Sequence, residues 1–115
     1  HPEMPAVWAL HFSPAEGVST GLILEEREKV TDLAKKLKVN HIFCGHTHLR
    51  KREVGTHPHI YCSGSVSAID STDKHYVHIC TLAKDASRML QLRVFDFKYS
   101  EDRKVFVPDP VSTVA

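Results

Sequence analysis

Three histidines have side chains and positions in the sequence that suit metal binding. His46 and His48 stand two positions apart, directly after the apolar run 42–44, and His11 directly follows the apolar run 7–10. Imidazole nitrogens are common ligands of transition metals such as zinc and iron. The His-x-His pair by itself is more typical of an exposed polar loop, but the placement of all three histidines after apolar runs makes a metal site an equal alternative.

The segments around these histidines predict a strand–helix–strand unit. Residues 7–10 and 41–44 are expected to be short strands, and apolar residues at helical spacing predict a helix over 25–37. Such a crossover makes the two strands parallel, and sites in open α/β sheets lie beyond the carboxyl ends of the strands. Because neighbouring strands lie ~4.8 Å apart, we expect the three imidazoles to converge at this edge, where Gly45 lets the backbone bend away.

The rest of the chain predicts mainly antiparallel strands. Strands are expected over 58–62, 76–82, 89–97 and 104–107, and the connection 83–88 predicts a hairpin between the second and third of these. The predicted fold is therefore of the mixed α/β (α+β) class, with a βαβ unit followed by antiparallel strands. Residues 1–108 are expected to form the domain portion, and residues 109–115 a poorly ordered tail.

Composition limits the function classes. The net charge of +1 does not indicate nucleic acid as a partner, and no apolar segment approaches the ~20 residues of a membrane-spanning helix. The three widely spaced cysteines form no disulfide framework, which favours a reducing, cytoplasmic location. The chain begins with His1 rather than methionine, so we expect a fragment or a processed chain.

Several further residues carry weaker signals. The basic run 50–52 is read as a solvated turn, although it is placed to meet a phosphate-bearing substrate, and residues 63–65 are read as a tight turn or part of a pocket floor. His57 and His59 are read as structural, with one of them a candidate to line the pocket. The three cysteines are expected to pack as small apolar residues, while His75 and His78 carry no signal. None of these residues is read as a second functional site.

Taken together, Leu10-His11, Ser13-Pro14, a helix, an apolar strand and Gly45-His46-Thr47-His48 resemble the C-terminal half of the calcineurin-like metallophosphoesterases. The resemblance covers positions 7–68, including Ser63-Gly64-Ser65. It implies a double β-sandwich flanked by helices and a phosphatase or phosphodiesterase with two divalent metal ions, manganese, iron or zinc. It also implies that His11 and His46 ligate the second metal ion and His48 the first. Paired metal ions activate a hydroxide that attacks the phosphoester.

The sequence also departs from that family. Its Asp-x-His, Gly-Asp-x-x-Asp and Gly-Asn-His motifs have no counterpart here, and Phe12 stands where many members have a second histidine. We therefore expect the isolated chain to be inactive, and another polypeptide segment or chain to complete both the metal site and the sheet. The alternatives are a non-catalytic interaction scaffold with the same architecture, and a small structural zinc domain using His46, His48 and a cysteine.

Overall fold

The structure, a computed structural model, describes residues 4–14, 24–45, 51–53, 57–63 and 76–109. It is a mixed α/β fold made mostly of strands. Its elements are β1 (Ala6–Ala9), α1 (Arg27–Lys36), β2 (Val39–Cys44), β3 (Lys51–Glu53), β4 (His59–Cys62), β5 (Tyr76–Lys84), β6 (Leu90–Ser100) and β7 (Val105–Pro108). The strands form a four-stranded sheet in the order β1-β2-β4-β3 and a three-stranded sheet in the order β5-β6-β7.

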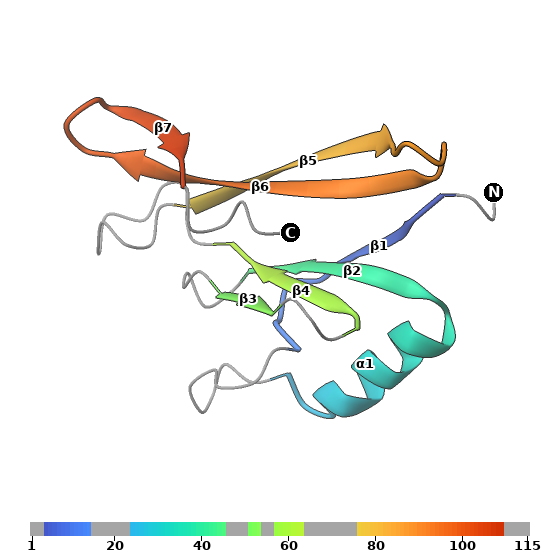
Figure 1. Cartoon of the computed structure of the whole chain (residues 1–115). Helices are drawn as coiled ribbons and strands as arrows, with labels where there is room; N and C mark the ends of the chain where they lie inside the picture. Colours follow the sequence, from blue (N-terminus) through green and yellow to red (C-terminus); the bar gives the residue numbers. More distant parts are fainter. Residues whose placement is uncertain (1–3, 15–23, 46–50, 54–56, 64–75, 110–115) are drawn as a thin grey trace.

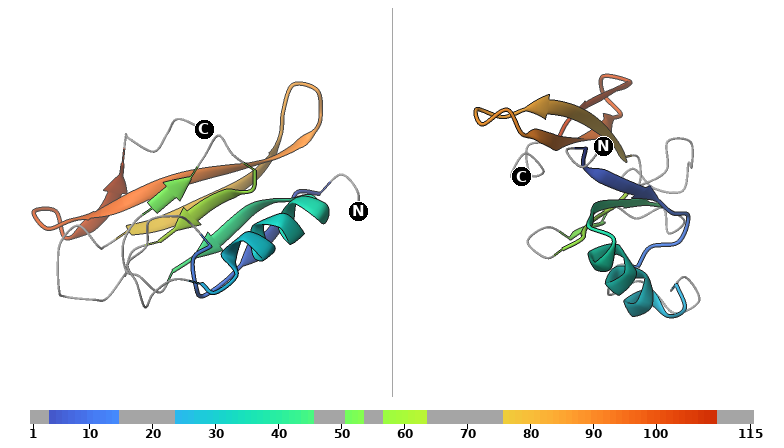
Figure 2. Two further views of the ribbon diagram at one scale, coloured as in Figure 1. Left: turned by 90° about the horizontal axis from the view of Figure 1, so that it is seen from below. Right: turned by 90° about the vertical axis from the view of Figure 1, so that its right-hand side faces the viewer.

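The elements are arranged in three layers. Figure 1 shows the four-stranded sheet in the middle, with α1 on one side and the antiparallel sheet on the other, and the end-on view of Figure 2 shows the same order. The main core lies between α1 and the four-stranded sheet. Its buried residues are Ala34, Val39, Ile42, Cys44, Ile60 and Cys62, with Trp8 and Leu10 packed against them. Burial in the middle sheet is concentrated in β2 and β4, which are central parallel strands, whereas β1 is largely exposed.

The predicted strand–helix–strand unit is confirmed. β1 pairs in parallel with β2 and β2 in parallel with β4, so three neighbouring strands run in the same direction. The basic run 50–52 was read as a solvated turn, and for its described residues, Lys51 and Arg52, this was wrong, because they lie in β3, antiparallel to β4. Strand pairing supplied by β4 decided the backbone conformation there, against a charged local sequence.

The helix is shorter than predicted and buries less of its apolar stripe. Ala34 is its buried residue, whereas Leu33 is 49% and Leu37 58% exposed. Periodicity identifies residues that share a helix face, but it does not say how far the neighbouring sheet extends beneath that face. Lys38, with φ of 55°, follows the last turn in the left-handed conformation.

The predicted hairpin is also confirmed. β5 and β6 pair antiparallel from Tyr76↔Lys98 to Lys84↔Leu90. The Asp85 carboxylate organises the turn by accepting hydrogen bonds from the backbone N–H groups of Ser87 and Met89, at 2.8 and 3.0 Å. β7 adds to β6 on its other side. Among the described residues, no helix has the length and apolar character needed to cross a membrane.

Candidate functional site

Three parallel strands end side by side at one edge of the four-stranded sheet. The Gly45 N–H donates to the His11 backbone oxygen at 3.1 Å, one step beyond the bond from the Leu10 N–H to the Phe43 oxygen at 2.8 Å. On the other side of β2, the Ser63 N–H donates to the Cys44 oxygen at 2.9 Å. The prediction that His11 lies beside the start of the Gly45–His48 segment is thereby confirmed.

The described part of this edge contains His11 but neither of the other two predicted metal ligands. His46 and His48, like Arg50, Gly64 and Ser65, lie outside the described residues. The His11 side chain is exposed, and its ring meets Phe12 edge-on with centroids 5.1 Å apart. An exposed imidazole at a strand end is accessible to a metal ion or a ligand from solvent.

The glycine at this edge is not required by backbone strain. A Cβ added to Gly45 would lie 3.8 Å from Ser63 Oγ, which is an ordinary van der Waals contact, and its φ is not in the left-handed region. Glycine instead leaves the surface between His11 and Ser63 free of a side chain. The backbone freedom expected for Gly45 is therefore not used in the described conformation.

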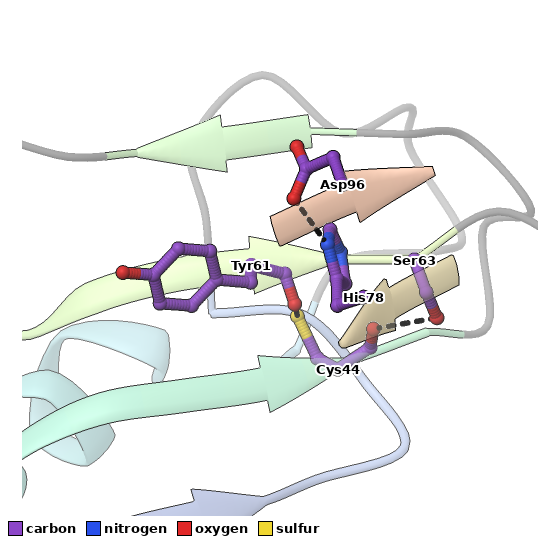
Figure 3. A network of polar contacts seen from close by, with 5 residues as sticks. All are labelled: Cys44, Tyr61, Ser63, His78 and Asp96. Atoms are coloured by element: carbon purple, nitrogen blue, oxygen red, sulfur yellow. Dashed lines mark hydrogen bonds and ion pairs between the residues drawn. The ribbon is translucent and has the colours of Figure 1, made fainter. Parts of the chain in front are cut away.

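A buried histidine–aspartate pair lies above the carboxyl ends of β2 and β4. His78 Nδ1 on β5 and Asp96 Oδ1 on β6 are 2.7 Å apart, and their side chains are 5% and 0% exposed. The His78 ring packs near Phe43 and Tyr61, with centroids 6.1 and 6.0 Å away. Figure 3 shows the pair next to the strands that carry Cys44 and Tyr61, with Ser63 just beyond the end of β4. The pair therefore connects the two sheets beside the candidate site.

No sequence motif singles out His78, but the structure places it in a buried pair with Asp96. The signal lay in the hairpin register, because pairing Lys84 with Leu90 places His78 opposite Asp96. A histidine and an aspartate directly opposite each other on one face of a hairpin are in contact distance. The second ring nitrogen of His78, Nε2, is buried and has no hydrogen-bond partner among the described residues.

A separate group of histidines lies at the opposite end of the parallel strands, where β2 and β4 begin. His57 precedes β4, and His41 and His59 are neighbours in the parallel register of β2 and β4. Ring centroids are 5.6 Å apart for His41 and His59, and 4.8 Å apart for His57 and His59. Burial, and then the nearby His59 and His57, lower the pKa of His41 below its usual value of 6.5. His57 and His59 lie at the start of β4, at the other end of this strand from Cys62 and Ser63.

The cysteines divide into two kinds. Cys44 and Cys62 are buried as predicted, but Cys80 is exposed, so its predicted packing was wrong. Partial burial of the Cys80 sulfur, and then Asp96, raise the pKa of this thiol. Among the side chains that the structure describes, no three histidine, cysteine, aspartate or glutamate residues are arranged to hold a metal ion.

The geometry thus places one predicted ligand, His11, beside Gly45, which directly precedes the predicted ligand His46. Behind this edge lie buried thiols, and above it lies the His78–Asp96 pair. Comparison of the sequence with models of protein families gives no match. Comparison with curated proteins also gives none.

Proposed function

We propose that the chain supplies His11, His46 and His48 to a dinuclear, metal-dependent phosphoester hydrolase. The observation that supports this most directly is the hydrogen bond from the Gly45 N–H to the His11 oxygen, at 3.1 Å. It holds His11 next to the segment that continues into His46 and His48. Convergence of histidines on parallel strand ends is the arrangement that the resemblance to calcineurin-like metallophosphoesterases implies, with a phosphatase or phosphodiesterase activity.

The residues fit the role of metal ligands in their accessibility and chemistry. The His11 imidazole is exposed at the edge, and neutral imidazole binds zinc and iron readily. Two divalent ions would supply Lewis-acid stabilisation of the phosphoryl oxygens and an activated hydroxide. Carboxylate ligands would come from another polypeptide segment or chain. The thiols of Cys44, Cys62 and Cys80 form no disulfide among the described residues, which fits the cytoplasmic location proposed for this activity.

Metal binding tests the ligand assignment on the chain itself. Zinc affinity is measured by calorimetric titration for the unsubstituted chain and for His11→Ala, His46→Ala and His48→Ala. Each substitution is expected to weaken binding about tenfold or more, because it removes a direct ligand. His57→Ala is the matched control, since this exposed histidine lies at the opposite end of the parallel strands. Equal affinity in the three variants and the control would overturn the assignment.

Activity is tested on the longest natural form of the protein. With manganese present, it is expected to hydrolyse a generic aryl phosphate, and replacing His46 and His48 by alanine is expected to abolish the reaction. Full activity of that double variant would contradict the proposal.

A non-catalytic interaction scaffold is the second candidate, and the sheet edge at β1 favours it. Among the described residues β1 pairs with β2 alone, and Met4 and Val7 are 54% and 43% exposed. An apolar, uncharged edge strand is a template for an added strand. The partner would be an extended polypeptide segment with alternating apolar residues. Replacing His46 and His48 separates the two functions, because partner binding through β1 does not need them.

A further inference from the structure

Two buried thiols and a hydroxyl lie in direct contact behind the candidate site. The Cys44 and Cys62 sulfurs are 3.0 Å apart, and Ser13 Oγ lies 2.9 Å from the Cys62 sulfur. Ser13 and Cys62 are 0% and 1% exposed, while Cys44 retains 6%. The Cys44 S–H donates to the Tyr61 backbone oxygen at 3.5 Å, the contact visible in Figure 3.

These contacts form a continuous polar chain inside the core. The Cys44 S–H is placed to donate to the Tyr61 oxygen, and either atom can be the donor between the two sulfurs and between Ser13 and Cys62. The two sulfurs thus face each other rather than the apolar core.

The strand register gives the two cysteines the separation of a disulfide. Cys44 and Cys62 are direct partners in the parallel pair β2–β4. Neighbouring strands lie ~4.8 Å apart, which falls inside the range of about 4.4–6.8 Å between Cα atoms that a disulfide spans. The sulfurs need to approach by only about 1 Å to reach bonding distance.

We propose that Cys44 and Cys62 are a dithiol that a hydroperoxide oxidises to an intramolecular disulfide. Cys44, the more exposed of the two, attacks the peroxide oxygen, which gives a sulfenic acid at Cys44 and releases water or an alcohol. The Cys62 sulfur then attacks the sulfur of the Cys44 sulfenic acid, and the disulfide forms. The hydroxyl group of the sulfenic acid leaves with the Cys62 proton as a molecule of water. The two thiols together lose two electrons and two protons, and the peroxide is reduced.

The link would join β2 to β4 at the candidate site. Cys44 directly precedes Gly45, and its backbone oxygen accepts hydrogen bonds from both the N–H and the hydroxyl of Ser63, at 2.9 and 3.4 Å. Strand pairing already holds the two backbones at a spacing that a disulfide spans, so the bond can form without a large movement of either strand. The proposal rests on the thiol geometry and does not depend on the proposed hydrolase function.

The test uses the whole chain carrying Cys80→Ser, which removes the exposed thiol and leaves the core unchanged. The folded protein is treated with hydrogen peroxide, then unfolded, alkylated and digested for mass spectrometry. The expected product is a peptide pair joined through Cys44 and Cys62 within one molecule, which a dithiol reductant separates. Cys44 and Cys62 that both remain alkylated, or are joined only between molecules, would overturn the proposal.

A competition experiment isolates the effect of the fold. The Cys80→Ser chain, either folded or unfolded in urea, is oxidised in the presence of a 1,3-dicarbonyl reagent that traps sulfenic acids and so competes with Cys62. The folded chain is expected to give at least a tenfold higher ratio of internal link to trapped sulfenic acid, because its sulfurs are already in contact. An equal or lower ratio in the folded chain would overturn the proposal. A further substitution, Cys62→Ser, is expected to abolish the intramolecular link.

Discussion

His41 shows how burial controls the charge of a single side chain. Its pKa is lowered by burial and by the neighbouring His59 and His57, so the folded chain binds a proton at this site less tightly than the unfolded chain. The contribution to stability is complete above the unfolded pKa of about 6.5 and is lost as the pH falls through the lowered pKa of the folded state. We therefore expect the free energy of unfolding to decrease on acidification below neutral pH.

Urea denaturation at a series of pH values measures this dependence. His41→Phe keeps an aromatic ring beside His59 and Tyr61 but removes the titrating group, so its stability is expected to vary less with pH than that of the unsubstituted chain. An identical pH dependence in the two proteins would show that His41 does not carry the effect.

The His78–Asp96 pair gives a second prediction for single residues. His78→Leu leaves the Asp96 carboxyl, whose side chain is 0% exposed, without its imidazole, and Asp96→Leu leaves the buried ring without its acceptor. Each substitution is expected to lower the free energy of unfolding by about 3 kcal/mol, because a buried polar partner loses its compensation. The double variant should cost clearly less than the sum of the two.

A matched cycle on the outer face of the same hairpin supplies the control. Thr81 and Arg93 are also directly opposite, but both are exposed. Their replacement by leucine is expected to change stability by about 0.5 kcal/mol or less, with little coupling. Similar coupling energies in the two cycles would mean that burial of the His78–Asp96 pair is not what makes it stabilising.

At the scale of elements, apolar runs and turn residues predicted most of the strands. The runs before His11 and Gly45 are strands in the structure, and their parallel order follows from the helix between them. β3 was missed because Lys51-Arg52-Glu53 has no apolar pattern, and its conformation comes from pairing with β4. Local sequence predicts strands that have an apolar pattern, but it does not predict a strand of charged residues, whose pairing with β4 is a tertiary contact.

At the candidate site, too, one feature could be predicted from the sequence and another could not. The position of His11 beside Gly45 followed from element order alone, since parallel strand ends meet at one edge. The contact of Cys44 with Cys62 depends on the register between β2 and β4, which are separated in sequence by β3. Periodicity within one element contains no information about register between elements, so the thiol pair could not be predicted.

For the whole molecule, the two edges of the four-stranded sheet differ in character. The β3 edge has the sequence Lys51-Arg52-Glu53, and charged residues discourage edge pairing. The β1 edge has the sequence Ala6-Val7-Trp8-Ala9, without charge, and Val7 is 43% exposed. Among the described strands, the β1 edge thus lacks the charged residues that discourage strand addition, as expected of a sheet that is completed by another strand.

We therefore expect the chain by itself to self-associate through β1, with a second copy taking the place of the completing strand. Val7→Lys is expected to return it to a monomer, because a lysine on the edge opposes pairing with a further strand. Val105→Lys is the matched control, since Val105 is 50% exposed on the outermost strand of the other sheet. Sedimentation velocity over a range of concentrations measures the mass in solution. A monodisperse monomer for the unsubstituted chain, or equal dissociation by both substitutions, would show that β1 is not the edge through which the sheet is completed.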